Sequence, residues 1–240
     1  MDIKIGVAHH REFYQFTNDI FFPIQVGRSL SDRYLDMIGD DGGHNISSKN
    51  GFYCELTATY WMWKNLKSAD YIGLCHYRRY FSPKENRLYF FIKKLKSFFF
   101  INKYESGAFY CKAKPISSVD IMDGLLENFS EFLRKDIDKR KVDIYALSPV
   151  KMLNINLHTH FSKPAGSFPI DLLVDIIKDL KPEYSKSLGE ALSGQKLFYA
   201  NMVIMSRIYF SEYCEFIFEV LQEHELRIVS SGWCQNPSVE

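Results

Sequence analysis

The fold follows first from the stretch DYIGLCHYRR, residues 70–79. Residues 70–75 form a short run of apolar and strand-forming side chains, and the polar residues of 76–79 end it abruptly. A short apolar run without polar alternation is typical of a strand that is buried on both faces, as in a parallel sheet. We therefore predict a buried parallel strand that delivers a polar cluster at its carboxyl end.

Other segments of the chain repeat this pattern and alternate with helical ones. Residues 3–8 (IKIGVA) and 142–147 (VDIYAL) predict further buried strands, and 198–205 predicts a fourth. Helical spacing is found in residues 52–66 after an N-cap at Asn50 or Ser48, in 169–180 between two prolines, and in 210–221. Strands that alternate with helices predict a layered α/β fold, with a mainly parallel central sheet flanked by helices, and we expect a single domain over residues 1–240.

The ends of the predicted strands indicate where a ligand would bind. Three strands are followed by polar groups, in residues 9–11 (HHR), 76–79 (HYRR) and 148–151 (SPVK). In an open α/β sheet, ligands bind in the crevice outside the carboxyl ends of the strands. We therefore expect the functional site at this edge.

Composition narrows the class of protein. The 240 residues are 46% hydrophobic and 25% charged, as in globular proteins, and a net charge of +1 argues against a nucleic-acid partner. The 20 Phe, 15 Tyr and 3 Trp suit a bulky core first and a stacking surface for sugars second. The five cysteines include no CxxC pair, and the four with apolar or aromatic neighbours read as reduced core residues. With no signal peptide and no apolar run long enough to span a bilayer, we expect a cytoplasmic protein.

The arginines of the second cluster are candidates for phosphate binding. Arg78 and Arg79 can each form bidentate hydrogen bonds to phosphate oxygens and can stabilise charge on a diphosphate leaving group. The alternative is a solvated turn with one arginine in a salt bridge.

The glycine-rich loop over residues 40–49 offers further polar groups. Asp40, Asp41 and Asn45 precede a predicted helix, whose start favours anions, although no GK[ST] motif follows. Glu55 is expected in the first turn of that helix, where a carboxylate suits the helix dipole as well as it suits catalysis.

Two more candidates lie further along the chain. If residues 158–160 are extended, His158 and His160 point to one side and could contact substrate, form a structural pair, or bind a metal with His76. Asn201 is the one amide in an apolar strand, and a buried amide needs partners from protein or ligand.

Residues 88–101 (LYFFIKKLKSFFFI) mix aromatic clusters with lysines. Such a segment can lie in the headgroup region of an anionic membrane, which would place the protein at the inner face of the cell membrane. The alternative is a core helix with a basic outer face.

Four blocks occur in an order that we recognise: PIQVG (23–27), DDG with NIS (40–42 and 45–47), CELTATYWMWKN (54–65) and YIGLCHYRRYF (71–81). Together they resemble the bacterial glycosyltransferase family of capsular and exopolysaccharide biosynthesis, long described as a domain of unknown function. The resemblance runs from about Ile3 to Leu221. Members of that family continue past the equivalent of Gln235, which leaves open whether a C-terminal segment is missing here.

The resemblance implies a GT-A-like, Rossmann-type fold and transfer of a sugar, with galactofuranose a candidate, from a UDP-linked donor to a lipid-linked or growing polysaccharide acceptor. The only Asp-x-Asp, residues 136–138, lies in a charged run that reads as a solvated helix face. We therefore favour a metal-independent enzyme in which Arg78 or Arg79 replaces the cation, with manganese or magnesium as the alternative.

Roles follow for the candidate residues. Catalytic candidates are Asp40, Asp41, Glu55 and His76; donor-binding candidates are His9, Asn45, Arg78 and Arg79; and acceptor or sugar contacts are His158, His160 and Asn201. A non-catalytic sugar- or nucleotide-binding module of a polysaccharide assembly complex is the alternative. A metal-dependent hydrolase that uses His76, His158 and His160 is a more distant one.

Overall fold

The computed structural model describes residues 1–82, 108–115, 122–198 and 200–233. The segment 88–101, for which we predict a membrane contact, lies outside these residues. The chain divides into two compact units, residues 1–148 with 200–211 and residues 149–199 with 212–240. Each unit is taken by itself below.

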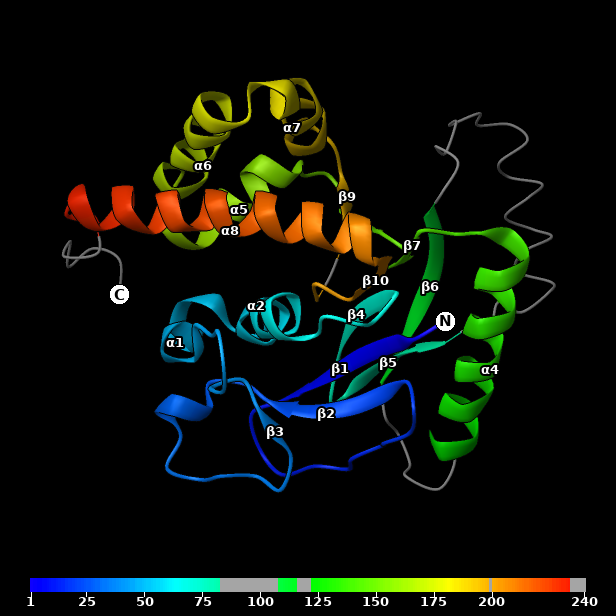
Figure 1. Ribbon diagram of the computed structural model, residues 1–240. Coiled ribbons are helices and arrows are strands. Elements are labelled where there is room, and N and C mark those ends of the chain that lie inside the picture. Colours follow the sequence, from blue (N-terminus) through cyan, green and yellow to red (C-terminus); the bar gives the residue numbers. More distant parts are fainter. Residues whose placement is uncertain (83–107, 116–121, 199, 234–240) are drawn as a thin grey trace, which may run out of the picture. The chain divides into compact units, whose positions relative to one another are not determined.

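The first unit is built on an eight-stranded mixed sheet with the order β10-β7-β6-β5-β4-β1-β2-β3 (Figure 1). Its strands are β1 (Ile3–His9), β2 (Phe21–Gln25), β3 (Ile38–Gly39), β4 (Tyr71–His76), β5 (Arg79–Ser82), β6 (Ala108–Pro115), β7 (Ile144–Leu147) and β10 (Val203–Ser206). The neighbours β3, β2, β1 and β4 are all parallel, whereas β10 is antiparallel to both β4 and β7. The predicted α/β fold with a largely parallel sheet is confirmed.

The chain order creates a switch point in this sheet. From β1 the chain moves outward to β2 and then β3, and it returns to form β4 on the other side of β1. The carboxyl ends of β1 and β4 therefore lie next to each other, with Ala8 in register with His76. Connections leave these two ends in opposite directions, and this is where a crevice opens in α/β sheets.

One helix packs on each face of β1 (Figure 1). Ile3, Ile5 and Val7 point into the core that they share with α4 (Met122–Arg140). The alternate residue Gly6 faces α2 (Leu56–Asn65), and a Cβ at this glycine would lie only 2.7 Å from the sulfur of Met62. Gly6 thus lets α2 approach the strand closely.

The predicted helix over residues 52–66 is broken in the structure. A short α1 (Asn50–Tyr53) ends at Cys54, whose φ of 48° and ψ of −131° no helix contains, and α2 begins after it. Phe52, which we expected on the apolar face, is 86% exposed. The buried face of α2 consists instead of Thr57, Ala58, Thr59 and Met62.

The fourth predicted strand is shorter than residues 198–205. Phe198 is exposed, and Ala200 and Asn201 form a turn with φ values of 67° and 46°. The strand β10 begins only at Val203.

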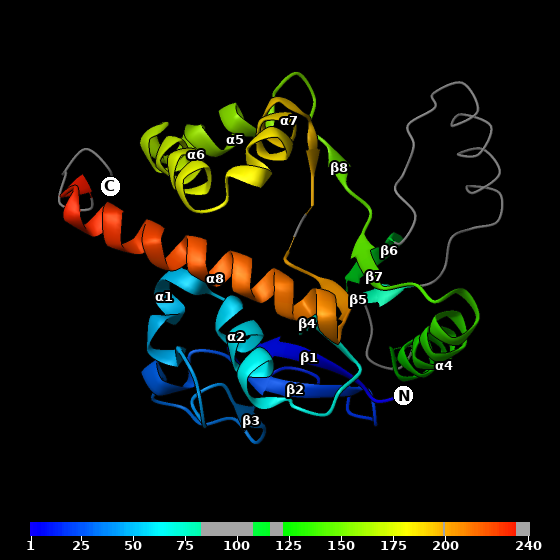
Figure 2. The same cartoon turned by 45° about the horizontal axis from the view of Figure 1, so that its top comes forward.

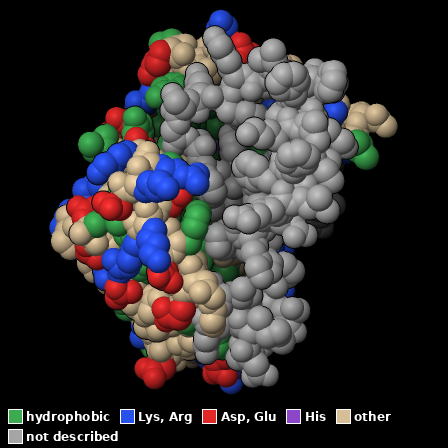
Figure 3. Space-filling view, turned by 90° about the vertical axis from the view of Figure 1, so that its right-hand side faces the viewer, with side chains coloured by type: hydrophobic (Ala, Val, Ile, Leu, Met, Phe, Trp, Pro, Cys, Tyr) green, Lys and Arg blue, Asp and Glu red, His purple; other side chains and the backbone are tan. Residues whose placement is uncertain are grey.

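The outer face of α4 carries charges of both signs close together (Figure 3). Glu131 pairs with Lys135 along the helix, and Arg134 pairs with Asp19. We predicted that Asp136 lies on a solvated face. This prediction is wrong, because Asp136 is only 7% exposed. Its carboxylate accepts a hydrogen bond from the Tyr145 hydroxyl, so half of the Asp-x-Asp pair belongs to the core.

The second unit is mainly helical (Figure 2). Its helices are α5 (Leu157–Ala165), α6 (Phe168–Leu180), α7 (Ser185–Ser193) and the part of α8 (Arg207–Ser230) from Glu212 onward. Its two-stranded sheet consists of β8 (Val150–Lys151), which comes before α5, and β9 (Lys196–Leu197), which comes after α7 and before α8. Ile176 and Ile177 of α6 pack on Val220 of α8, as the apolar spacing of both predicted helices requires.

Candidate functional site

The two polar clusters HHR and HYRR meet at the switch point. His76 and Arg79 pair across a tight hairpin between β4 and β5, with Tyr77 and Arg78 at its tip. The backbone N–H of Tyr77 donates to the carbonyl of Ala8 at 3.1 Å, which ties this tip to the end of β1. Two of the three strand-end clusters that the sequence places at one edge are therefore neighbours, whereas residues 149–151 of the third belong to the second unit.

A pocket of about 270 Å³ opens at this edge. It is lined by Ala8, His10, Val26, Asn50, Cys54, Glu55 and His76. We call it the Glu55 pocket, because Glu55 supplies its carboxylate. It brings together two predicted catalytic residues, Glu55 and His76, that are 21 positions apart in the chain.

Glu55 is held in place by a residue far away in sequence. Its Oε1 accepts a hydrogen bond of 3.1 Å from Nδ2 of Asn201. Each partner follows a residue with an unfavourable positive φ, which is Cys54 before Glu55 and Ala200 before Asn201. Such conformations cost about 1–3 kcal/mol each and gather at functional sites. Asn201 is thus exposed in a turn and reaches the pocket, rather than being buried in a strand.

Three imidazoles lie beside this pocket. His9 is fully buried and neither of its ring nitrogens has a hydrogen-bond partner of good geometry. Burial lowers the pKa of His9 to about 4, with His76 and His10 acting in the same direction and the Arg11 backbone opposing them. Burial also lowers the pKa of His76, whose Nδ1 is unpartnered, while the Glu55 carboxylate opposes that shift.

Tyr77 is the centre of the cluster of rings. Its side chain is fully buried, and its ring centroid lies 4.6 Å from that of His76 and 5.1 Å from that of His10. The guanidinium carbons of Arg78 and Arg11 lie 5.0 Å and 5.6 Å from the same centroid. Both distances are within the range of a cation–π contact.

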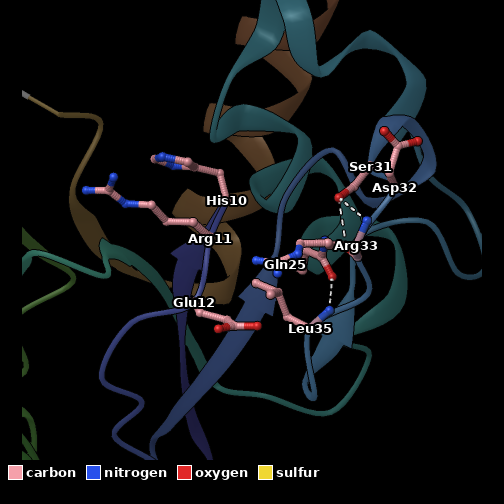
Figure 4. Close-up of a pocket in the computed structure, with 8 residues that line it drawn as sticks. All are labelled: His10, Arg11, Glu12, Gln25, Ser31, Asp32, Arg33 and Leu35. Carbon is pink, nitrogen blue, oxygen red and sulfur yellow. Dashed lines mark hydrogen bonds between the residues drawn. The ribbon is translucent and has the colours of Figure 1, made fainter.

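A second pocket of about 240 Å³ adjoins the first and shares His10 with it. Its lining comes from the ends of β1 and β2 and from the loop after η1 (Arg28–Leu30), and consists of His10, Arg11, Glu12, Gln25, Ser31, Asp32, Arg33 and Leu35 (Figure 4). We call it the Gln25 pocket. The amide of Gln25 is already engaged, donating to the Arg33 carbonyl at 2.7 Å and accepting from the Leu35 N–H at 2.8 Å. The exposed polar groups that remain here belong to His10, Arg11, Glu12, Asp32 and Arg33.

The polar residues of loop 40–47 have a different environment. Asp40 is fully buried, and its carboxylate accepts from the N–H groups of Gly27 and Arg28 and from the Ser47 hydroxyl. Asn45 donates to two carbonyls of its own loop and accepts from the Ser47 N–H. This environment favours a structural role for both residues over the catalytic and donor-binding roles that we expected. Asp41 is exposed, and its carboxylate lies 3.9 Å from Nε of Arg28.

The His-x-His segment is helical, because residues 157–165 form α5. In a helix, neighbours two positions apart point in different directions, so the extended arrangement that we predicted is wrong. His158 contacts Asp171 at 2.8 Å, whereas the ring of His160 packs on that of Phe161. Both histidines lie in the second unit, whereas His76 lies in the first. Across the described residues, no three His, Cys, Asp or Glu side chains gather as metal ligands.

Comparisons with known proteins fit this geometry. A family model described as "Domain of unknown function (DUF4422)" matches residues 4–236. The chain belongs to the DUF4422 family.

No curated protein matches this DUF4422 chain. Among solved structures, it is similar to the apo structure of WbbM, a bifunctional glycosyltransferase, with 27% sequence identity and a TM-score of 0.75. The match covers 94% of this chain and 37% of WbbM, so the chain spans little more than a third of that protein. The glycosyltransferase-like fold that the sequence motifs imply is therefore confirmed. None of the described helices is long and apolar enough to cross a bilayer.

Sequence reasoning missed part of the site in this DUF4422 domain. His10, Arg11 and Tyr77 were available to it, because they follow the same two strands as the residues that we selected. Arg33 and Asp32 carried no comparable signal, since they come from a loop that only the folded chain brings to the end of β1.

Proposed function

We propose that this DUF4422 chain is a glycosyltransferase that moves a sugar from a nucleotide-diphosphate donor to a lipid-linked or growing polysaccharide acceptor. UDP is the nucleotide and galactofuranose the candidate sugar, as the sequence motifs imply. Similarity to WbbM over 94% of the chain supports the class of reaction. The location of both pockets at the switch point supports a nucleotide-linked ligand.

The single observation that carries the proposal is the environment of Glu55. It is a half-buried carboxylate in a pocket at the sheet edge, oriented by Asn201 and next to the unpartnered Nδ1 of His76. A residue that served only the start of α2 would need neither the distant amide nor the strained backbone at Cys54. General bases need this combination of a fixed orientation and access to a substrate proton.

The sugar would then be transferred in a single displacement step. As an acceptor hydroxyl attacks the anomeric carbon of the donor, its O–H bond breaks and the proton passes to the Glu55 carboxylate. A new C–O bond forms to the acceptor, and the bond between the anomeric carbon and the phosphate oxygen breaks. The electron pair leaves with the nucleoside diphosphate, on which negative charge accumulates.

Two positively charged residues follow His76 closely in the chain, in the β4–β5 hairpin. Arg78 and Arg79 are both exposed, and neither guanidinium has an ion pair or hydrogen bond with another described residue. These groups would neutralise the leaving diphosphate in place of a divalent cation. Asp41 remains a predicted catalytic residue, and His158 and His160 remain predicted acceptor or sugar contacts.

The test measures release of UDP from UDP-galactofuranose and UDP-galactopyranose, with and without oligosaccharide and lipid-linked galactose acceptors, in EDTA and in manganese. Glu55→Gln should lower turnover by about 10²- to 10⁴-fold with little change in donor affinity, because it removes the base but keeps an acceptor oxygen for Asn201. Glu131→Gln, an exposed change on α4, is the matched control and should leave turnover unchanged.

Three outcomes would contradict the proposal or a part of it. If Glu55→Gln transfers sugar at the rate of the unaltered protein, Glu55 is not the base. If UDP binds while no donor and acceptor pair gives turnover, the chain is a non-catalytic nucleotide-binding module. Activity in manganese that EDTA abolishes would show that the guanidiniums do not replace a cation.

A further inference from the structure

The arginines of the described chain fall into two groups. Five have guanidinium partners: Arg28, Arg134, Arg140, Arg207 and Arg227 each make a hydrogen bond or an ion pair. In the other described arginines, Arg11, Arg33, Arg78 and Arg79, the guanidinium has neither. These four lie at the Gln25 pocket or in the β4–β5 hairpin. The unpaired guanidiniums of the described arginines are therefore concentrated at the proposed donor site.

Two of these arginines contact the same aromatic ring. Arg11 follows β1 and Arg78 lies at the tip of the hairpin, yet both guanidiniums contact the ring of Tyr77. Tyr77 is fixed by burial and by its N–H bond to Ala8. Cation–π contacts with a buried ring limit the rotamers of the two long side chains, so less conformational entropy remains to be lost when an anion binds.

His10 contacts the same tyrosine as the two arginines. Its pKa is lowered by desolvation and then by the charges of Arg11 and Arg78, so both cations act on the same imidazole. Its Nε2 is 3.5 Å from the Tyr77 hydroxyl. The side chains of His10 and Arg11 extend in the same direction from the end of β1 (Figure 4). His10 also lines both pockets, and Arg11 lines the Gln25 pocket beside it.

The carboxylates of the two pockets make no ion pair with these arginines. Glu55 is hydrogen-bonded to Asn201, and Glu12 and Asp32 make no ion pair with a described residue. The two pockets, which share His10, therefore combine carboxylates that can accept from hydroxyl groups with unpaired guanidiniums that can bind an anion. A nucleoside diphosphate sugar offers both kinds of group, because its ribose and its transferred sugar carry hydroxyls on either side of the diphosphate.

We propose that Tyr77 positions Arg11 and Arg78, together with His10, as a clamp for the diphosphate of the donor. The nucleoside then lies in the Gln25 pocket and the transferred sugar in the Glu55 pocket. The inference rests on the proposed function and adds three residues to it, of which Arg11 and His10 contact the ligand. Tyr77 is a positioning residue, because its buried ring acts through the two guanidiniums.

The experiment measures binding of inorganic pyrophosphate and of UDP by calorimetry at constant pH and ionic strength, with EDTA present. Arg11→Gln and Arg78→Gln should each weaken both ligands by about tenfold or more, because each removes a charge-assisted hydrogen bond. Lys67→Gln removes the same charge from an exposed position that makes no described contact, and it should change either affinity by less than about twofold.

The role of Tyr77 needs its own pair of variants. Tyr77→Phe keeps the ring and should bind pyrophosphate within about threefold of the unaltered protein, whereas Tyr77→Leu should lose about tenfold. If Tyr77→Leu does not fold, the double variant Arg11→Gln/Arg78→Gln replaces it. Two arginines that hold one diphosphate should give a double loss that departs from the product of the single losses.

The outcomes separate this inference from the proposed function. Equal losses in Arg78→Gln and Lys67→Gln, or strictly independent losses in the two arginine variants, would overturn the clamp even if sugar transfer is observed. Pyrophosphate binding that depends on both arginines, in a protein that transfers no sugar, would support the clamp and reject the transferase.

Discussion

Loop 40–47 and the edge formed by residues 9–11 and 76–79 are both rich in polar groups, but they differ in how those groups are satisfied. In the loop, Asp40 and Asn45 use their side chains to hold the surrounding backbone. At the edge, the guanidiniums of Arg11 and Arg78 and the ring nitrogens of His9 have no hydrogen-bond partner. Composition alone does not separate a structural loop from a binding site.

The difference indicates which residues are available to a ligand. A buried polar group without a partner costs free energy, so native proteins satisfy nearly all of them. At the switch point the ring nitrogens of His9 and Nδ1 of His76 are such exceptions, whereas the exposed guanidiniums of Arg11 and Arg78 are open to solvent and can exchange water for a ligand. Predictions that contrast the two regions test this view, beginning with the largest expected effect.

Removal of the Asp40 carboxylate should destabilise the protein most. Asp40→Ala leaves two buried N–H groups and the Ser47 hydroxyl without their acceptor, and the free energy of unfolding should fall by about 4 kcal/mol. The neighbouring Asp41→Ala, which loses only an ion pair of 3.9 Å, should change it by less than about 1 kcal/mol. Urea denaturation of both variants decides the matter, and equal losses would remove the distinction between the two carboxylates.

His9 predicts a pH dependence of nearly the same size. Its pKa falls from 6.5 to about 4 on folding, so the unfolded chain binds the proton more tightly and stability is lost as pH falls from 6.5 towards 4. The loss attributable to His9 is about 3 kcal/mol at and below pH 4, since one pKa unit corresponds to 1.36 kcal/mol. Unfolding of His9→Phe over pH 4–7 should show a correspondingly shallower slope.

Exposed His44 provides the control for this measurement. His44→Gln should keep the slope of the unaltered protein, because His44 is exposed. His10 and His76, which face His9 across the Tyr77 ring cluster, have lowered pKa values too and contribute with the same sign. A slope that His9→Phe leaves intact would therefore assign the effect to them.

Much of the fold was predictable, because buried parallel strands leave a simple pattern. The apolar runs at residues 3–8, 70–75 and 142–147 correspond to β1, β4 and β7, and their polar ends identified the edge of the site. The wrong prediction of an extended segment at residues 158–160 was avoidable. Asn156 is the N-cap of α5 and accepts from the Thr159 N–H, and an asparagine before an apolar residue is a recognised signal for the start of a helix.

The contact at the centre of the site could not be predicted in this way. Glu55 and Asn201 are separated by 146 positions, and their approach depends on positive φ angles at Cys54 and Ala200. Neither cysteine nor alanine favours such angles, so propensity predicts a continuous helix and a continuous strand there. The departure from local preference is itself the indication that the surrounding structure enforces these turns.

Substitution of Gly27, next to the buried Asp40, should have an effect on stability of intermediate size. Its φ is 64°, its N–H donates to Asp40, and an added Cβ would lie 2.6 Å from Oδ1 of Asn50. Gly27→Ala should therefore cost about 2 kcal/mol of stability, and it should disturb the Glu55 pocket through Asn50. Gly51→Ala, in α1 with no neighbour within 4 Å of the new Cβ, should cost nothing or stabilise slightly. Similar losses in both variants, measured by urea denaturation, would contradict the proposed strain at Gly27.

The smallest expected change in stability is the most informative about function. Arg78→Gln removes a guanidinium that makes no hydrogen bond or ion pair, so the free energy of unfolding should change by less than about 0.5 kcal/mol. Arg207→Gln removes bonds to the carbonyls of Ala69 and Leu66 and should cost about 2 kcal/mol. If Arg78→Gln destabilises the protein as much as Arg207→Gln does, Arg78 serves the hairpin. If Arg78→Gln leaves the free energy of unfolding unchanged while pyrophosphate affinity falls, the Arg78 guanidinium contributes to ligand binding and not to folding.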